Sequence, residues 1–222
     1  MKKTGSAEQR ALLIVNSLSK QGNRKFRRLY RFIESAGVLI AKKFLAPHYR
    51  QIVVLKDRSA TYQAFLETIG QLSNDRRIRA VDLFLQLHGK PGSVYFYDRQ
   101  VMTRRLSLAI RKAALKDCLR IVYNTSCYGD SHSGDLLSAG FKAAVGSIGV
   151  NANAASEYPV FCRYWPGTGR NRRNKPGLAE LIKKADRQGP RLFADRLAGR
   201  YFKDVDSRKN VRGDGTITVD KF

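Results

Sequence analysis

Short apolar runs alternate with segments of helical spacing along most of the chain, and this alternation is the strongest constraint on its fold. The runs are apolar on both faces, which is typical of strands buried on both sides of a sheet. Helices between such strands favour a largely parallel sheet with right-handed crossovers and helices on both faces. Strands are predicted over residues 11–18, 51–57, 80–89, 119–127 and 143–151, and helices over 23–44, 59–74, 101–115, 134–140 and 177–202, the last interrupted at Gly189-Pro190.

The length and composition of the chain fit one large domain. It has 222 residues, of which 43% are hydrophobic, and this is enough to bury a core without disulfide staples. We predict an α/β core over residues 1–165. A basic, helical C-terminal part over 166–222 is expected to pack on the same domain and to end in a turn and a strand. Residues 93–98 are expected to form one arm of a small hairpin or an extended excursion.

The three cysteines, Cys118, Cys127 and Cys162, are widely spaced and form neither a CxxC pair nor a zinc-binding pattern. An odd, scattered set of this kind argues against a disulfide framework and indicates a reducing, cytoplasmic setting. Two lysines precede the first apolar run, but Glu8 and Arg10 lie between them and the run is short. We therefore expect a buried strand there rather than a signal peptide, and we expect no membrane span.

The chain is strongly basic. Lys and Arg number 42 against 18 Asp and Glu, which gives a formal net charge of +24. Such an excess attracts nucleic acid, anionic membranes or acidic proteins. The basic residues are densest at 24–28, 75–79, 102–106 and 169–175. The composition leaves open whether they serve a specific anionic partner or form only a solvated surface.

Two residues typical of cysteine-based catalysis end consecutive strands of the predicted sheet. His88 ends the third strand and precedes Gly89, and Cys127 ends the fourth. Each alone is more often structural, but ligands bind beyond the carboxyl ends of parallel strands, where neighbouring strands would bring both side chains together. An imidazole in that place favours formation of the nucleophilic thiolate. We predict Cys127 as nucleophile, His88 as its proton partner, and the N–H groups of Gly89 and Cys127 as oxyanion donors.

The segments LFLQLHGKPG and IVYNTSCYGDSHSGDLLSAGFKAAVGSIGVN resemble the caspase-like cysteine peptidases, the group of caspases, gingipains, clostripain, legumain and separase. The shared pattern is a strand ending in His-Gly and a strand ending in a small residue and Cys. A short glycine-bearing loop, a helix and a further apolar strand follow. Bacterial CHAT domains are the most similar, because there the Cys loop runs straight into the helix. The resemblance covers roughly residues 10–165. It implies a three-layer α/β fold and a His-Cys dyad that cleaves peptide bonds without a cofactor.

The sequence departs from its relatives near the cysteine. The caspase signature Q-A-C-[RQG]-G is not met, because the chain has Thr-Ser-Cys-Tyr-Gly at 125–129. Metacaspase-like relatives place Asp where this chain has Thr125, so a pocket for Arg or Lys is not indicated. Arg24, after the first strand, could face an acidic side chain, as an arginine there does in caspases. The candidate substrate-binding residues are Arg24, Thr125, Ser126 and Asn151.

Two further motifs and two alternative functions remain open. The sequence leaves open whether His132 has no chemical role, acts as a second base or contacts the substrate. With Asp130 and Asp135 it completes no compact metal-ligand set. The tail segment DGTIT resembles half of an EF-hand loop, but Arg212 and Lys221 stand where acids are needed, so a turn and a terminal strand are expected. The alternatives to a peptidase are a caspase-like binding module without turnover and a basic nucleic-acid-binding protein. Aromatic residues beside arginine in RRLYRF and CRYW would suit the second.

Overall fold

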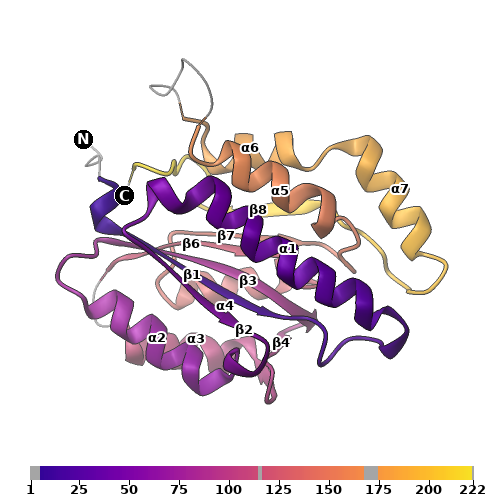
Figure 1. The fold of residues 1–222 in the computed structure, drawn as a ribbon, viewed down its shortest axis with the longest axis horizontal. Coiled ribbons are helices and arrows are strands. Elements are labelled where there is room, and N and C mark those ends of the chain that lie inside the picture. Colours follow the sequence, from indigo (N-terminus) through magenta and orange to yellow (C-terminus); the bar gives the residue numbers. More distant parts are fainter. Residues whose placement is uncertain (1–5, 115–116, 168–174, 222) are drawn as a thin grey trace.

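A computed structural model describes residues 6–114, 117–167 and 175–221. It is built around one eight-stranded sheet, in which six strands form the main row (Figure 1). In sheet order these strands are β2 (Gln51–Lys56), β1 (Arg10–Ser17), β3 (Ala80–Lys90), β6 (Leu119–Asn124), β7 (Ala143–Ser147) and β8 (Lys209–Gly213). Every neighbouring pair in the row is parallel except β7 and β8, which are antiparallel.

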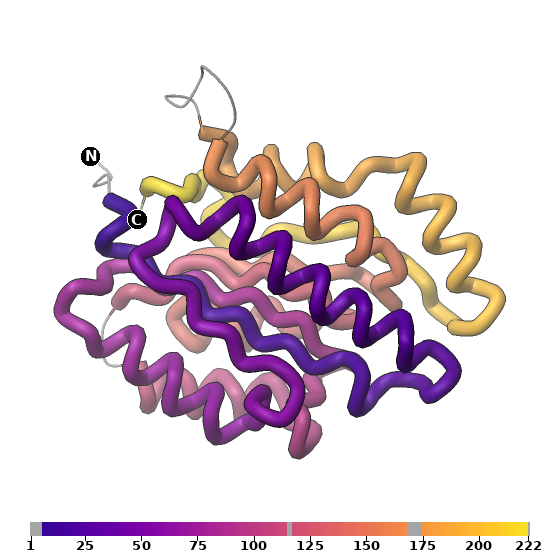
Figure 2. Tube along the Cα trace, in the orientation of Figure 1, coloured from indigo at the N-terminus to yellow at the C-terminus, as the bar shows by residue number. Residues whose placement is uncertain are grey.

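Helices cover both faces of this sheet (Figures 1 and 2). One layer consists of α1 (Arg27–Leu45), α5 (Ala154–Tyr164), α6 (Leu178–Ala185) and, at its outer end, α7 (Gln188–Ala198). The other layer consists of α2 (Tyr62–Asn74), α3 (Thr103–Ala113) and α4 (Gly129–Ser138). The predicted three-layer caspase-like α/β fold, with a mostly parallel central sheet, is confirmed.

The alternation along β1 explains why both faces are filled. Leu12 and Ile14 belong to the core on the α1 side, and Leu13 and Val15 belong to the core on the α2 side. All four side chains are fully buried. A strand that buries every side chain must lie inside a sheet with two covered faces, as its sequence predicted.

A small hairpin extends the sheet beyond the end of β3. Its strands β4 (Ser93–Tyr95) and β5 (Gln100–Met102) are antiparallel, and β4 pairs with His88, Gly89 and Lys90. Residues 93–98 therefore begin a hairpin, one of the two forms that the sequence left open. The hairpin borders the edge at which β3 and β6 end.

Several helices begin or end at other residues than the sequence predicted. The predicted helix over 177–202 breaks at Asp186-Arg187, because Pro190 lies in the first turn of α7, where its missing N–H removes no helical hydrogen bond. Helix α4 begins at Gly129, directly after Tyr128, which has a left-handed φ of 57°. Helix α5, which contains Pro159, was not predicted from the sequence. It forms because its buried face, including Phe161, packs into the core on the α1 side.

The terminal strand also lies elsewhere than predicted. It forms at Lys209–Gly213, and the chain then reverses at Gly213, whose φ is 81°. Thr216 closes the turn by donating its N–H and hydroxyl hydrogen bonds to Asp214. Ile217 and Val219 are buried instead of extending the sheet. The end of the predicted helix over 101–115 and most of the basic stretch 169–175 lie outside the described residues. Among the helices that are described, none has the length and apolar character needed to cross a membrane.

Candidate active site

His88, near the end of β3, and Cys127, just beyond the end of β6, lie at the same edge of the sheet. β3 and β6 run in parallel with Leu85 opposite Asn124; His88 follows three positions later within β3, and Cys127 follows three positions later in the loop after β6. A Cβ added at Gly89 would come within 2.6 Å of the carbonyl oxygen of Cys127. The backbone at the end of β3 is therefore in direct contact with the loop after β6, and only glycine permits this approach.

The ring of His88 is held on two sides. Its Nε2 lies 2.7 Å from the carbonyl oxygen of Leu18, so this nitrogen carries the proton and donates it to the carbonyl. The ring also meets Tyr30 of α1 edge-on, with centroids 4.9 Å apart. Burial lowers the pKa of His88 below its ordinary 6.5, although the Leu18 carbonyl and the charge of Glu34 act in the opposite direction. The ring is therefore neutral near pH 7, with Nδ1 as the acceptor.

Cys127 is partly buried at the start of the turn into α4. Burial raises the pKa of its thiol above the ordinary 9.0, and the backbone N–H of Asn151 and the charge of Lys209 partly oppose this. Within the described residues, no hydrogen bond joins Cys127 to His88. The site thus contains a neutral thiol and a neutral imidazole rather than a preformed ion pair.

The two predicted oxyanion donors differ in their surroundings. In the described part of the chain, the N–H of Cys127 has no acceptor on another residue, although its neighbours Ser126 and Tyr128 both donate theirs. Gly89 lies in the ladder between β3 and β4, opposite Val94. The N–H of Cys127 is thus available to an oxygen of a ligand.

A buried polar network sets the shape of the cysteine loop, residues 125–128 between β6 and α4. The Asn124 amide oxygen accepts hydrogen bonds from the N–H and the hydroxyl of Ser126, at 3.0 and 2.5 Å. The Asn124 amide nitrogen donates to His132 Nδ1 at 3.1 Å, and His132 Nε2 donates to the Lys90 carbonyl at 2.8 Å. His132 therefore ties the cysteine loop to the end of β3. It is fully buried, which excludes the sequence-based suggestions that it contacts substrate or acts as a second base.

The candidate substrate residues near the cysteine prove to be mostly internal supports. Ser126 is buried within the Asn124 network. Thr125 donates its hydroxyl to the Leu85 carbonyl at 3.1 Å, and its own carbonyl accepts from the Asn151 amide at 2.9 Å. Asn151 therefore fixes the loop from the β7 side. Sequence position alone could not separate such supports from groups that face a ligand.

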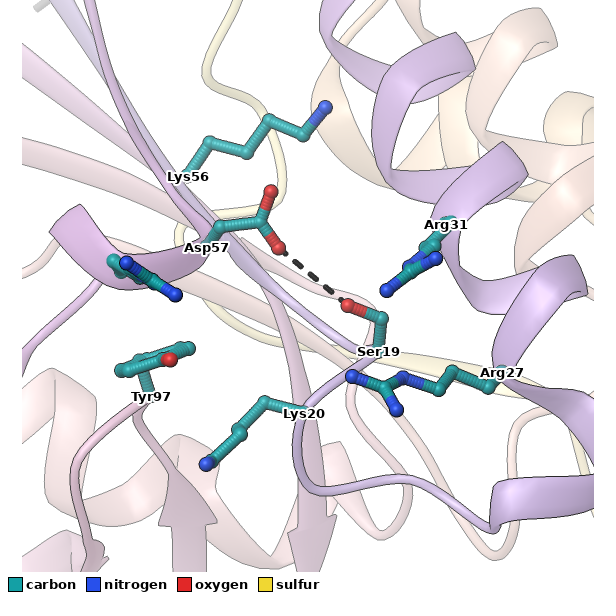
Figure 3. A pocket seen from close by; sticks show the side chains of 8 residues that line it. Ser19, Lys20, Arg27, Arg31, Lys56, Asp57 and Tyr97 are labelled. Atoms are coloured by element: carbon teal, nitrogen blue, oxygen red, sulfur yellow. Dashed lines mark hydrogen bonds between the residues drawn. The ribbon is translucent and has the colours of Figure 1, made fainter.

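Arg24 lies in a short 3-10 turn, Arg24–Phe26, before α1, and it is exposed. It does not line the open pocket of about 680 Å³ beside the loop that holds His88. Five other cationic side chains surround that pocket, with Asp57 as its one acid and with Ser19 and Tyr97 (Figure 3); they are Lys20, Arg27, Arg31, Lys56 and Arg58. Ser19 and Lys20 directly follow Leu18, so the pocket adjoins the support of His88.

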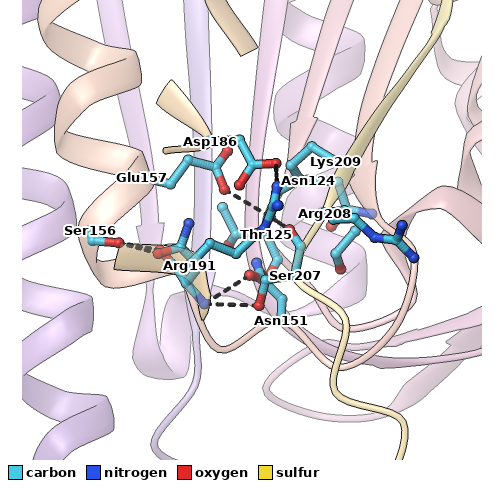
Figure 4. A network of polar contacts seen from close by, with 12 residues as sticks. Asn124, Thr125, Asn151, Ser156, Glu157, Asp186, Arg191, Ser207, Arg208 and Lys209 are labelled. Atoms are coloured by element: carbon cyan, nitrogen blue, oxygen red, sulfur yellow. Dashed lines mark hydrogen bonds and ion pairs between the residues drawn. The ribbon is translucent and has the colours of Figure 1, made fainter. Parts of the chain in front are cut away.

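A second polar network lies under the loop from the C-terminal side (Figure 4). Lys209 of β8 and Glu157 of α5 form a fully buried ion pair at 2.9 Å, and Glu157 also accepts a hydrogen bond from Tyr123 at 2.6 Å. Ser207 accepts hydrogen bonds from the N–H groups of Ala152 and Asn153. The field of Lys209 at the thiol is a contribution that no local sequence pattern revealed.

The suggested metal ligands are engaged in other contacts. Asp130 binds Arg212 and Asn210 of β8, and Asp135 accepts the hydroxyl of Thr103 at 2.5 Å. Over the described residues, no group of three or more His, Cys, Asp or Glu side chains is arranged to hold a metal ion.

The fold is similar to the folds of several solved structures. Caspase-1 from Spodoptera frugiperda superposes with a TM-score of 0.59 at 12% identity, over 96% of this chain and 89% of that one. The structure of pro-sf-caspase-1 gives 0.54 at 11% identity, over 96% and 93%. A secreted C11 cysteine protease from Bacteroides thetaiotaomicron gives 0.51 at 12% identity, over 74% and 58%. The chain thus spans little more than half the length of the Bacteroides protease.

The likeness is one of structure, since no family model and no curated protein matches the sequence. It extends over 96% of this chain in both caspase-1 comparisons. The chain has the fold of the caspase-like cysteine peptidases.

Proposed function

We propose that the protein is a cysteine endopeptidase in which Cys127 attacks the scissile carbonyl and His88 moves the proton. The observation that supports the proposal is the position of both residues at the carboxyl ends of neighbouring strands, where Gly89 packs against the Cys127 carbonyl and His88 Nε2 binds the Leu18 carbonyl. That bond leaves Nδ1 as the ring nitrogen that accepts a proton. The similarity in fold to cysteine proteases supports the same reaction class.

The reaction follows from the neutral state of both groups. As Sγ bonds to the carbonyl carbon, the thiol proton passes to His88 Nδ1. The oxyanion of the tetrahedral intermediate accepts hydrogen bonds from the N–H groups of Cys127 and Gly89. The imidazolium then protonates the leaving amine, and water, with its proton taken by His88, hydrolyses the thioester. Lys209 favours the anionic sulfur as it forms.

The basic pocket supports a preference for substrates with acidic side chains. Its five cations form no ion pair with an acid within the described residues, and only Asp57 offsets their charge. Like charges around one cavity repel each other, and an anionic group from a substrate relieves that repulsion. We assign this role to Lys20, Arg27 and Arg31 in place of Arg24, and we assign Thr125, Ser126 and Asn151 to holding the loop.

The test is differential alkylation combined with cleavage of a mixed peptide library. Cys127 should react with iodoacetamide faster than Cys118 or Cys162, which are both buried. Cys127→Ala and His88→Ala should each lower peptide cleavage by at least about a thousandfold, because the two groups act as a unit. Cleaved peptides should be enriched in Asp and Glu.

Two controls separate this proposal from its alternatives. His48→Ala changes a histidine at the opposite edge and should leave cleavage unchanged. A caspase-like binding module would cleave no peptide that Cys127→Ala leaves intact, and His88→Ala would not slow alkylation of its Cys127. A nucleic-acid-binding protein would retain salt-sensitive affinity for nucleic acid after Cys127→Ala and would cut nothing.

A further inference from the structure

Helix α7 directs its polar anchors towards the protein. Arg191 forms an ion pair with Asp186 at 2.6 Å. Asp195, one turn later, accepts the hydroxyl of Ser207 at 2.5 Å and its N–H at 3.3 Å. These two residues hold the helix against the segment before β8. Surface helices normally attach through an apolar stripe, so this attachment is inverted.

The apolar side chains of α7 face solvent as a consequence. Leu192, Phe193 and Leu197 are 55%, 73% and 49% exposed, and no residue of the helix is buried. Tyr201, just beyond it, is 64% exposed. A helix whose large apolar residues cluster on the outside presents an unpartnered binding surface.

The start of α1 adjoins this surface. The ring of Phe26 contacts those of Tyr201 and Phe202, with centroids 5.4 and 5.9 Å apart. Leu29 and Phe32, in the first turns of α1, are 52% and 69% exposed. The α7–α1 face is defined here by the following exposed side chains: Leu29, Phe32, Leu192, Phe193, Leu197 and Tyr201.

The exposed charged side chains on helices α1 and α7 are all positive. Glu34 is the one acid of α1 and is buried, and Asp195 is the one acid of α7 and is bonded inward. The exposed cations of the two helices are Arg27, Arg28, Arg31, Lys42, Lys43 and Arg196, and beyond α7 the exposed Arg200 and Lys203 outnumber the exposed Asp204. An apolar centre within a cationic rim matches a partner that is apolar beneath an anionic surface.

We propose that the α7–α1 face docks on the surface of an anionic lipid bilayer. The apolar side chains would enter the headgroup region while Arg and Lys contact the lipid phosphates. Two copies of the face pressed together would oppose their cationic rims, which argues against self-association. Tyr30 of α1 contacts the His88 ring, so docking brings the candidate active site close to the membrane. The binding itself does not depend on the proposed peptidase activity.

The test is co-sedimentation with vesicles of phosphatidylcholine alone and of phosphatidylcholine mixed with phosphatidylglycerol. The wild-type protein should bind the mixed vesicles, and the double variant Phe193→Ser/Leu197→Ser should bind at least about tenfold more weakly, because two apolar insertions are lost. The matched control is Met102→Ser/Leu108→Ser, which removes two apolar side chains, in β5 and α3, that are 57% and 53% exposed. This control should bind like wild type.

Insertion is read directly from fluorescence. The chain has one tryptophan, Trp165, which is fully buried and supplies a constant background. Phe193→Trp should shift its emission to shorter wavelength when mixed vesicles are added, and Leu108→Trp should not. Equal binding of wild type and the Phe193/Leu197 variant would reduce the affinity to net charge and overturn the proposal. So would failure to bind either vesicle, or lipid-free dimerisation that the double variant abolishes.

Discussion

Ionisable side chains lie at both ends of the neighbouring strands β3 and β6, and the two ends are organised in opposite ways. At the amino ends, Arg120 and Asp82 form a fully buried ion pair, with Arg120 Nε 2.8 Å from the carboxylate. Tyr49 donates a further hydrogen bond to Asp82 at 2.5 Å, and Arg120 donates to the carbonyl of Val219. These charges have partners on several sides.

At the carboxyl ends, His88 and Cys127 are neutral and do not bond to each other within the described chain. His88 Nδ1 and the Cys127 N–H keep unused hydrogen-bonding capacity. The comparison teaches that burial of ionisable groups does not by itself mark a functional site. A closed set of charges stabilises the fold, whereas incompletely bonded groups at an accessible edge are available for reaction.

We expect the largest effect from breaking the buried ion pair between Arg120 and Asp82 at the amino ends of β3 and β6. Asp82→Ala leaves the Arg120 guanidinium buried without its anion, which typically costs about 3–5 kcal/mol of folding free energy. Urea unfolding should show this loss, and any loss of activity should follow the loss of folded protein. Asp75→Ala breaks the exposed pair with Arg77 and is the control, expected to leave the unfolding midpoint unchanged. Similar midpoints for the two variants would break the comparison.

We expect an intermediate effect from Glu34, a buried residue that supports the loop bound to His88. Its carboxylate accepts the N–H groups of Leu18 and Ser19, at 2.5 and 2.8 Å, and so positions the carbonyl that binds His88. Glu34→Gln keeps an acceptor but loses the charge-assisted bonds, and peptide cleavage should fall about tenfold. Because the Glu34 charge raises the pKa of His88, the acid limb of the pH profile should also move to lower pH. An unmoved limb would make Glu34 merely structural.

We expect the smallest effect from a change of pH, which tests the protonation states of His88 and Cys127. The pKa of His88 is lowered below 6.5, so His88 remains the neutral base through that pH and the acid limb of cleavage should lie below it. The pKa of Cys127 is raised above 9.0, so its alkylation rate without substrate should still climb as pH passes 9. A reactivity plateau near neutral pH would instead indicate a preformed thiolate–imidazolium pair.

The sequence predicted those parts of the molecule that depend on local pattern. Two-faced apolar strands imply a covered sheet, and residues at consecutive strand ends imply a shared edge, which is where His88 and Cys127 lie. The start of α4 was missed because Gly, Asp and Ser have low helix propensity, yet the turn at Tyr128 and packing against β7 place them in a helix.

Long-range contacts to the site could not be read from the sequence. The support of His88 is a backbone carbonyl, that of Leu18, and every residue has one. Lys209 reaches the cysteine only because β8 joins the sheet beside β7, far along the chain. His132 beside a cysteine is chemically plausible as a base, and only its burial and its bonds to Asn124 and Lys90 assign it to the scaffold.

The position of Lys209 has a consequence for the order of synthesis. A ribosome releases His88 and Cys127 well before Lys209, and domains complete their folding as the missing segments emerge. Until β8 pairs with β7, Glu157 has no cation and the 151–153 loop lacks its bonds to Ser207. On a nascent chain, Cys127 therefore lacks the positive charge of Lys209 beside it. In the proposed peptidase, the surroundings of Cys127 would therefore be complete only once the last strand of the sheet has been added.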